Sequence, residues 1–146
     1  MVPMTDETEV LVGGLRVPEL LLKAIRKDRW VAPSDPALLA SIFGEAPQQP
    51  TFYKVNGMVR ENESWHSEME PETREWYVGS KSLESPPGDI DPARSLLIGD
   101  MGPDQPFALD YRTSDSDPSV VYLRSDNGWV EIAPNIRALL SLLGVV

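Results

Sequence analysis

The only histidine of the chain, His66, is the residue best suited to general acid–base chemistry, because an imidazole titrates near neutral pH. It lies in the stretch ENESWHSEMEPE, close to Ser64, Ser67 and Glu68. A catalytic triad is made by residues that meet in space, so closeness in sequence does not indicate one. Six carboxylates lie between residues 61 and 75, and this favours a solvated position for His66. We therefore predict that the chain is not an enzyme, and catalysis at His66 is the least favoured alternative.

Acidic residues around a glycine–proline turn are the second candidate for chemistry. Asp100 and Asp104 flank Gly102-Pro103 in the stretch GDMGPDQP, which lacks the ligand spacing of an EF-hand calcium loop. We expect both carboxylates to cap turns of their own backbone. Gly99 and Gly102 do not have the spacing of a phosphate-binding loop. The chain also has no cysteine, which excludes thiolate chemistry and disulfides. No metal site and no cofactor is predicted.

The negative charge of the chain is unevenly distributed. The formal net charge is −10. Residues 1–60 carry seven basic and seven acidic side chains, whereas residues 61–146 carry six basic and sixteen acidic ones. Such a field repels nucleic-acid phosphates and anionic lipids and favours a basic partner. The alternative is that the acidic surface serves only solubility.

The length and the apolar segments predict one soluble domain. A chain of 146 residues matches the size of a single domain, which we place at 1–146 with residues 1–15 as a flexible lead-in around Gly13-Gly14. The first residues lack the pattern of a secretory signal. The longest apolar stretch, ALLSLLGVV, is far shorter than the roughly 20 residues that span a bilayer. A cytoplasmic location without membrane binding is expected, and the oligomeric state stays open.

Capping residues and apolar spacing predict helices near both ends of the chain. Pro18 begins a helix over about 18–28. Asp35, Pro36 and Gly44 are typical of the N-cap, first position and end of a second helix. A short helix is expected over 58–65. Asn135 begins a last helix, which ends at Gly144 and has apolar residues at Ile136, Leu139, Leu140 and Leu143.

The middle of the chain predicts strands. Residues 51–55 and 76–79 are rich in aromatic and β-branched residues. Four more apolar runs, each bounded by turn residues, are spaced about ten residues apart at 96–98, 107–111, 120–123 and 129–132. The sequence therefore predicts an α+β fold. N-terminal helices are followed by an antiparallel meandering sheet of about five to six strands, with a C-terminal helix packed on the sheet.

The second half of the chain resembles the SUKH superfamily, which is abundant in bacteria and includes a yeast regulator of cell-wall glucan synthesis. The stretch LLIGDMGPDQPFALDYR is followed by SVVYL, then GWVEIAP, then an amphipathic helix. The likeness covers about residues 17–144 and is closest over 86–144. The residues that match the family signature are Ile98, Gly99, Asp100, Gly102, Asp110, Tyr111, Arg112 and Trp129.

The resemblance implies an α+β fold with no shared catalytic residue. Bacterial members are mostly thought to be immunity proteins that bind and neutralise a polymorphic toxin, often a nuclease or a deaminase. In this reading Gly99 and Gly102 permit the turn, and Tyr111 and Trp129 fill the core. Asp110 and Arg112 are expected to form an ion pair or to stabilise a turn. The alternative is a regulatory protein-interaction module without a toxin.

The acidic segment 61–75 is the predicted partner-binding surface. We expect it to be exposed on a helix end and a loop, with its carboxylates as the polar rim of an interface with a basic toxin domain. Trp65 or Trp76 could be the buried anchor of that interface, and the alternative is that both indoles belong to the core. The rim residues are Glu61, Glu63, Glu68, Glu70, Glu72 and Glu75.

Overall fold

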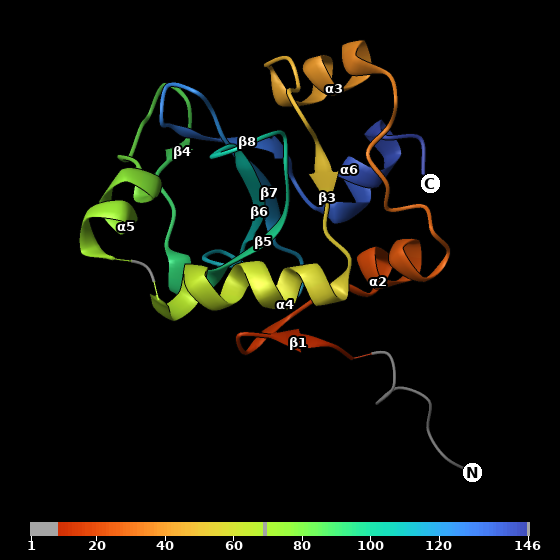
Figure 1. The fold of residues 1–146 in the computed structure, drawn as a ribbon, viewed down its shortest axis with the longest axis horizontal. Helices are drawn as coiled ribbons and strands as arrows, with labels where there is room; N and C mark the ends of the chain where they lie inside the picture. Colours follow the sequence, from red (N-terminus) through yellow and green to blue (C-terminus); the bar gives the residue numbers. More distant parts are fainter. Residues whose placement is uncertain (1–8, 69, 146) are drawn as a thin grey trace.

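A six-stranded antiparallel sheet is the centre of the molecule (Figure 1). The structure is a computed structural model, and it describes residues 9–68 and 70–145, without the side chain of Glu68. In spatial order the strands are β3 (Thr51–Phe52), β5 (Ser95–Asp100), β6 (Pro106–Asp110), β7 (Ser119–Leu123), β8 (Trp129–Ala133) and β4 (Pro87–Gly88). The four longer strands form the predicted meander, and short strands pair with both of its outer members.

Each face of the sheet carries its own apolar cluster, because successive side chains of a strand point to opposite faces. The larger cluster joins one face to the helices α2 (Glu19–Arg26), α3 (Pro36–Phe43) and α6 (Ile136–Leu142). The smaller cluster, on the other face, consists of Trp65, Ile90, Leu97, Ala108, Val121, Leu123 and Trp129. The α+β prediction and the packing of the C-terminal helix on the sheet are therefore confirmed.

Local capping signals position two of these helices as predicted. The Asp35 carboxylate accepts a hydrogen bond from the backbone N–H of Ala37 at 3.0 Å, and Gly44 ends α3 with a left-handed φ of 82°. The Asn135 side chain accepts one from the backbone N–H of Ala138 at 2.9 Å. These bonds satisfy backbone donors that have no partner inside the helix.

Two element predictions in the middle of the chain are wrong. Residues 76–79 were expected to form a strand, but they belong to or follow helix α5 (Pro71–Val78). Pro71 at the start, Glu72 in the first turn and Gly79 at the end are helix signals that outweigh the strand preference of Trp-Tyr-Val. The strand expected over 51–55 is limited to β3, because Val55 already begins helix α4 (Val55–Glu63).

The prediction that residues 1–15 form a flexible lead-in is wrong for residues 11–15. Residues 1–8 lie outside the described residues. Strands β1 (Leu11–Val12) and β2 (Leu15–Arg16) form a hairpin whose turn is Gly13-Gly14, both with positive φ. Val12 and Leu15 are buried in the larger cluster, and this burial stabilises the hairpin.

Helix α4 and the π-helical turn after it, η1 (Ser64–Glu68), run along the edge of β5 that β3 leaves uncovered. Asn62 is only 1% exposed. Its amide donates to the carbonyl of Leu97 at 2.9 Å and accepts from the N–H of Leu97 at 2.8 Å, as a neighbouring strand would. Trp65 Nε1 donates to Ser95 Oγ at 2.9 Å. These bonds fix the helix against the sheet.

Within the described part of the chain, no helix is sufficiently long and apolar to cross a membrane.

Candidate partner-binding face and pocket

The predicted rim glutamates lie on two helices that follow one another along the chain, α4 and α5. Glu61 and Glu63 are on α4, Glu70 is the N-cap of α5, and Glu72 and Glu75 are on α5. All five are exposed, as predicted. The side chain of Glu68 lies outside the described residues. We call the five described glutamates the acidic face.

The two candidate anchors have opposite environments. Trp65 is 4% exposed and packs its ring 6.1 Å from that of Trp129. Trp65 is therefore a core residue, and its prediction as a surface anchor is wrong. Trp76 is 48% exposed and packs edge-on against the neighbouring Tyr77 ring at 4.7 Å. Trp76 is thus the tryptophan that remains available to a partner.

His66 does not lie on a solvated face, contrary to expectation. Its ring is half-buried, and its Nε2 lies 2.8 Å from the carbonyl oxygen of Ser95, which can only accept a hydrogen bond. On its other side the ring touches the β1–β2 hairpin, where a Cβ on Gly13 would lie 2.1 Å from Nδ1. The histidine therefore ties η1 and the hairpin to the start of β5.

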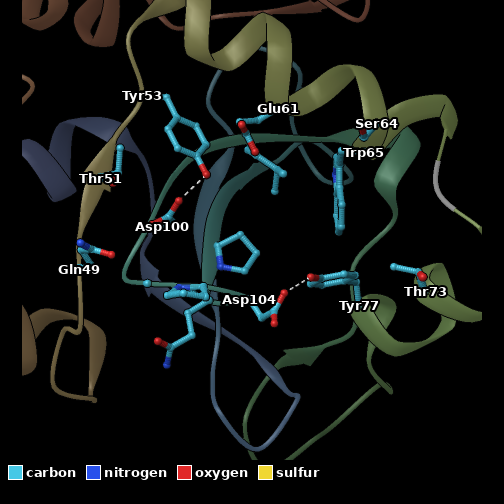
Figure 2. Close-up of a pocket in the computed structure, with 15 residues that line it drawn as sticks. Gln49, Thr51, Tyr53, Glu61, Ser64, Trp65, Thr73, Tyr77, Asp100 and Asp104 are labelled. Atoms are coloured by element: carbon cyan, nitrogen blue, oxygen red, sulfur yellow. Dashed lines mark hydrogen bonds between the residues drawn. The ribbon is translucent and has the colours of Figure 1, made fainter.

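A pocket of about 550 Å³ opens between α4, η1, α5 and the turn that joins β5 to β6. Three aromatic rings line it, those of Tyr53, Trp65 and Tyr77. The carboxylates that line it belong to Glu61, Asp100 and Asp104, and among its described lining residues there is no lysine or arginine. Figure 2 shows Tyr53 and Asp100 on one side of the pocket and Tyr77 and Asp104 across from them. The pocket is thus aromatic and negatively charged.

Two tyrosine–aspartate hydrogen bonds fix the pocket walls. The Tyr53 hydroxyl donates to Asp100 Oδ2 at 2.6 Å, and the Tyr77 hydroxyl donates to Asp104 Oδ1. Burial raises the pKa of the Asp100 carboxyl, and neighbouring Glu61 adds to this, although bonds from Tyr53 and the Gly102 N–H oppose it. Burial and the bond to Asp104 raise the pKa of Tyr77 to about 12. Ionisation of Asp100 therefore lowers the stability of the folded state.

Alkaline titration should show that the folded state keeps its tyrosine side chains protonated. All four tyrosines have a pKa above the ordinary 10.0, chiefly because burial disfavours the phenolate. The folded state keeps them neutral, so this stability is complete below pH 10 and is lost as the pH rises towards 12 and beyond. We expect phenolate absorbance to appear together with the loss of the circular dichroism of the fold. Phenolate formation near pH 10 in a still folded protein would contradict this.

The apolar and aromatic residues of the signature are core residues. Ile98, Tyr111 and Trp129 are almost fully buried. The Tyr111 hydroxyl donates to the carbonyl of Arg16, and Trp129 Nε1 donates to that of Tyr77 at 2.7 Å. These residues hold the N-terminal hairpin and α5 against the sheet.

The turn residues of the signature differ in part from expectation. Gly102 has a positive φ of 153° and lies in the turn, whereas Gly99 lies inside β5. A Cβ on Gly99 would lie 2.4 Å from the Phe107 ring, so the glycine is required for ring packing and not for the turn. The carboxylate of Asp100 accepts from the Tyr53 hydroxyl at 2.6 Å, and the Gly102 N–H also lowers its pKa. The carboxylate of Asp104 accepts from the Tyr77 hydroxyl and not from its own turn.

Asp110 and Arg112 form the expected ion pair. Arg112 Nη2 lies 3.0 Å from Asp110 Oδ2, and Nη1 lies 3.1 Å from Asp89 Oδ1. Asp110 also caps the local turn by accepting from the backbone N–H of Arg112 at 3.1 Å. The bonds to Asp110, with those to Asp89, raise the pKa of Arg112. The cluster connects the end of β6 to the loop that follows β4.

The pocket was not predicted. Tyr53 and Asp100 are 47 residues apart, and Tyr77 and Asp104 are 27 apart, so no spacing rule brings them together. Among the described residues, no three histidine, aspartate or glutamate side chains are placed to hold a metal ion.

Comparison with known proteins identifies no relative. No family model, no curated protein and no solved structure matches the chain.

Proposed function

We propose that this chain is a non-catalytic protein-binding domain whose acidic face binds a basic protein, and that this protein is a toxin, which the chain neutralises in the cytoplasm. The toxin assignment depends on the resemblance to the SUKH superfamily. The preference for a basic protein over nucleic acid or membrane depends on charge.

The observation that supports the proposal most strongly is the position of the charges. The exposed glutamates of α4 and α5 lie on the two helices that also form walls of the carboxylate-lined pocket. Glu61 belongs to both features. Surfaces of one sign speed the encounter with a partner of the opposite sign and exclude partners of the same sign. Exposed Trp76, on α5, supplies a large apolar side chain of the kind that dominates binding energy.

Co-expression with a toxin tests the biological role. The toxin domain to use is the one encoded in the reading frame beside the gene, and the expected result is that the chain restores growth of cells that this domain kills. Failure of the wild-type chain to restore growth would overturn the toxin assignment. Binding of a non-toxic neighbour instead would favour a regulatory module.

Charge reversal tests the acidic face. We expect the triple variant E63K/E72K/E75K to associate with the toxin domain about tenfold more slowly at low salt, with the difference shrinking as salt screens the charges. The matched control is E9K/E19K/E131K, which reverses three exposed glutamates elsewhere and changes the net charge equally, from −10 to −4. Stopped-flow mixing across a salt series gives both rates. Equal slowing of the two variants would show a net-charge effect and exclude a specific face.

A further inference from the structure

We propose that the pocket between α4, α5 and the β5–β6 turn receives the cationic side chain of a lysine or arginine from the protein partner. This inference rests on the proposed protein-binding function and names the chemistry that the pocket would recognise.

The hydrogen-bonding groups of the pocket are suited to a cationic donor. The hydroxyls of Tyr53 and Tyr77 already donate to aspartates, so the phenol oxygens are left as acceptors beside the carboxylates. Asp104 Oδ2 makes no hydrogen bond to any described residue, and Asp104 is exposed. Ammonium and guanidinium groups carry only donors, and their bonds to carboxylates are among the strongest in proteins. An anionic or acceptor-rich ligand would meet three carboxylates, of which Glu61 is paired with a cation, Arg60, at 3.7 Å.

The aromatic rings suit the same ligand. Trp65 and Tyr77 pack edge to face, with ring centroids 6.1 Å apart and planes at 81°. Figure 2 shows Trp65 extending from the helix beside Tyr77. Aromatic faces attract lysine and arginine cations, most strongly where water is partly excluded. Nearly buried Trp65 and Leu97 line the inside, whereas exposed Glu61, Ser64 and Thr73 lie at the opening. The cationic end of a long side chain can therefore contact the ring of Trp65 or Tyr77 and donate to the carboxylates beside it.

The partly buried carboxylate of Asp100 also favours a cationic ligand. Burial makes the ionised form unfavourable in the folded protein, and the pocket residues include no cation to offset this. A bound cation would favour the ionised carboxylate and relieve this cost. Charges held at a cost to stability are common at binding sites.

Asp104→Asn is the most informative variant. The residue has a left-handed φ of 60°, which asparagine adopts readily. The asparagine side chain can still accept the Tyr77 bond, so the change removes charge and leaves the local structure. The matched control is Asp28→Asn, at an exposed aspartate with a left-handed φ of 56° that does not line the pocket.

The experiment is a titration of the full chain, labelled with ¹⁵N, with the peptide acetyl-Gly-Arg-Gly-amide. A second peptide with citrulline, which has the same shape as arginine but no charge, is the comparison. We expect the arginine peptide to shift the indole N–H of Trp65 and the amides of Gly102 and Asp104 in a saturable manner. Asp104→Asn should raise the dissociation constant by about tenfold, whereas Asp28→Asn should leave it unchanged.

Three results would overturn the inference. Equal binding of the citrulline peptide would show that charge is not recognised. Shifts confined to exposed glutamates of α5, without Trp65, would place the peptide outside the pocket. The absence of saturable shifts would show that the pocket takes no cationic side chain.

The pocket and the proposed function can fail separately. If the wild-type chain restores growth against the toxin and Asp104→Asn does so equally well at limiting expression, the immunity role stands and the pocket has no part in it. If the peptide binds as expected but no growth is restored, the pocket stands and the toxin assignment fails.

Discussion

Replacing Asn62 with alanine is expected to lower the free energy of unfolding by about 3 kcal/mol. The Asn62 amide is 1% exposed and bonds both backbone groups of Leu97 as well as the carbonyl of Met58. Alanine would leave the N–H and the carbonyl of Leu97 without those partners in a buried place. Losing these bonds lowers the stability by more than a typical hydrogen bond contributes. The reason is that buried polar groups are left unpaired and cannot bond to water instead.

Urea unfolding followed by tryptophan fluorescence measures this effect. The control is Asn56→Ala, an exposed asparagine on the same helix, for which a change within about 0.5 kcal/mol is expected. Equal midpoints for the two variants would show that the bonds to Leu97 contribute nothing to stability.

Replacing Arg112 with alanine should also cost about 3 kcal/mol. Asp110 is 7% exposed, and loss of the guanidinium would leave its charge buried without a cation. Arg112 also bonds the backbone carbonyl of Asp89 at 3.0 Å, which fixes the loop beyond β4. We therefore expect the remaining charge, more than the lost bonds, to dominate the destabilisation.

A second substitution separates the two causes. Combining Arg112→Ala with Asp110→Asn removes the unpaired charge, and the double variant should be more stable than Arg112→Ala alone. Arg137→Ala, an exposed arginine on α6, is the control and should unfold as the wild type does. If the double variant were less stable by the full sum of the single effects, the charge would not be the cause.

The parts of the fold that were predictable have local causes. The four meander strands are apolar runs bounded by turn residues, and α3 and α6 begin at side chains that cap their own helix. Residues 76–79 were wrongly predicted as a strand because Trp76, Tyr77 and Val78 have a strand preference and the residues before them are polar. The proline and the glycine at the ends of α5 carried the stronger information.

The candidate site was predictable only where exposure follows from composition. A dense run of glutamates must remain in water, so the exposure of Glu61, Glu63 and Glu72 followed from the sequence. The burial of Trp65 depends on Ser95 and Trp129, which are distant in sequence. The pocket depends on pairs of residues that only the completed sheet and helices bring together, so the sequence contained no local signal for it.

The contact of α4 with β5 also affects whether copies of the protein pair with one another through their strand edges in solution. A bare strand edge is a template for pairing with another chain, and natural proteins block such edges. Here β3 pairs with only Gly99 and Asp100 of β5, and side chains of Asn62 and His66 occupy the backbone groups of Leu97 and Ser95. The helix therefore protects this edge against intermolecular β-sheet growth and aggregation.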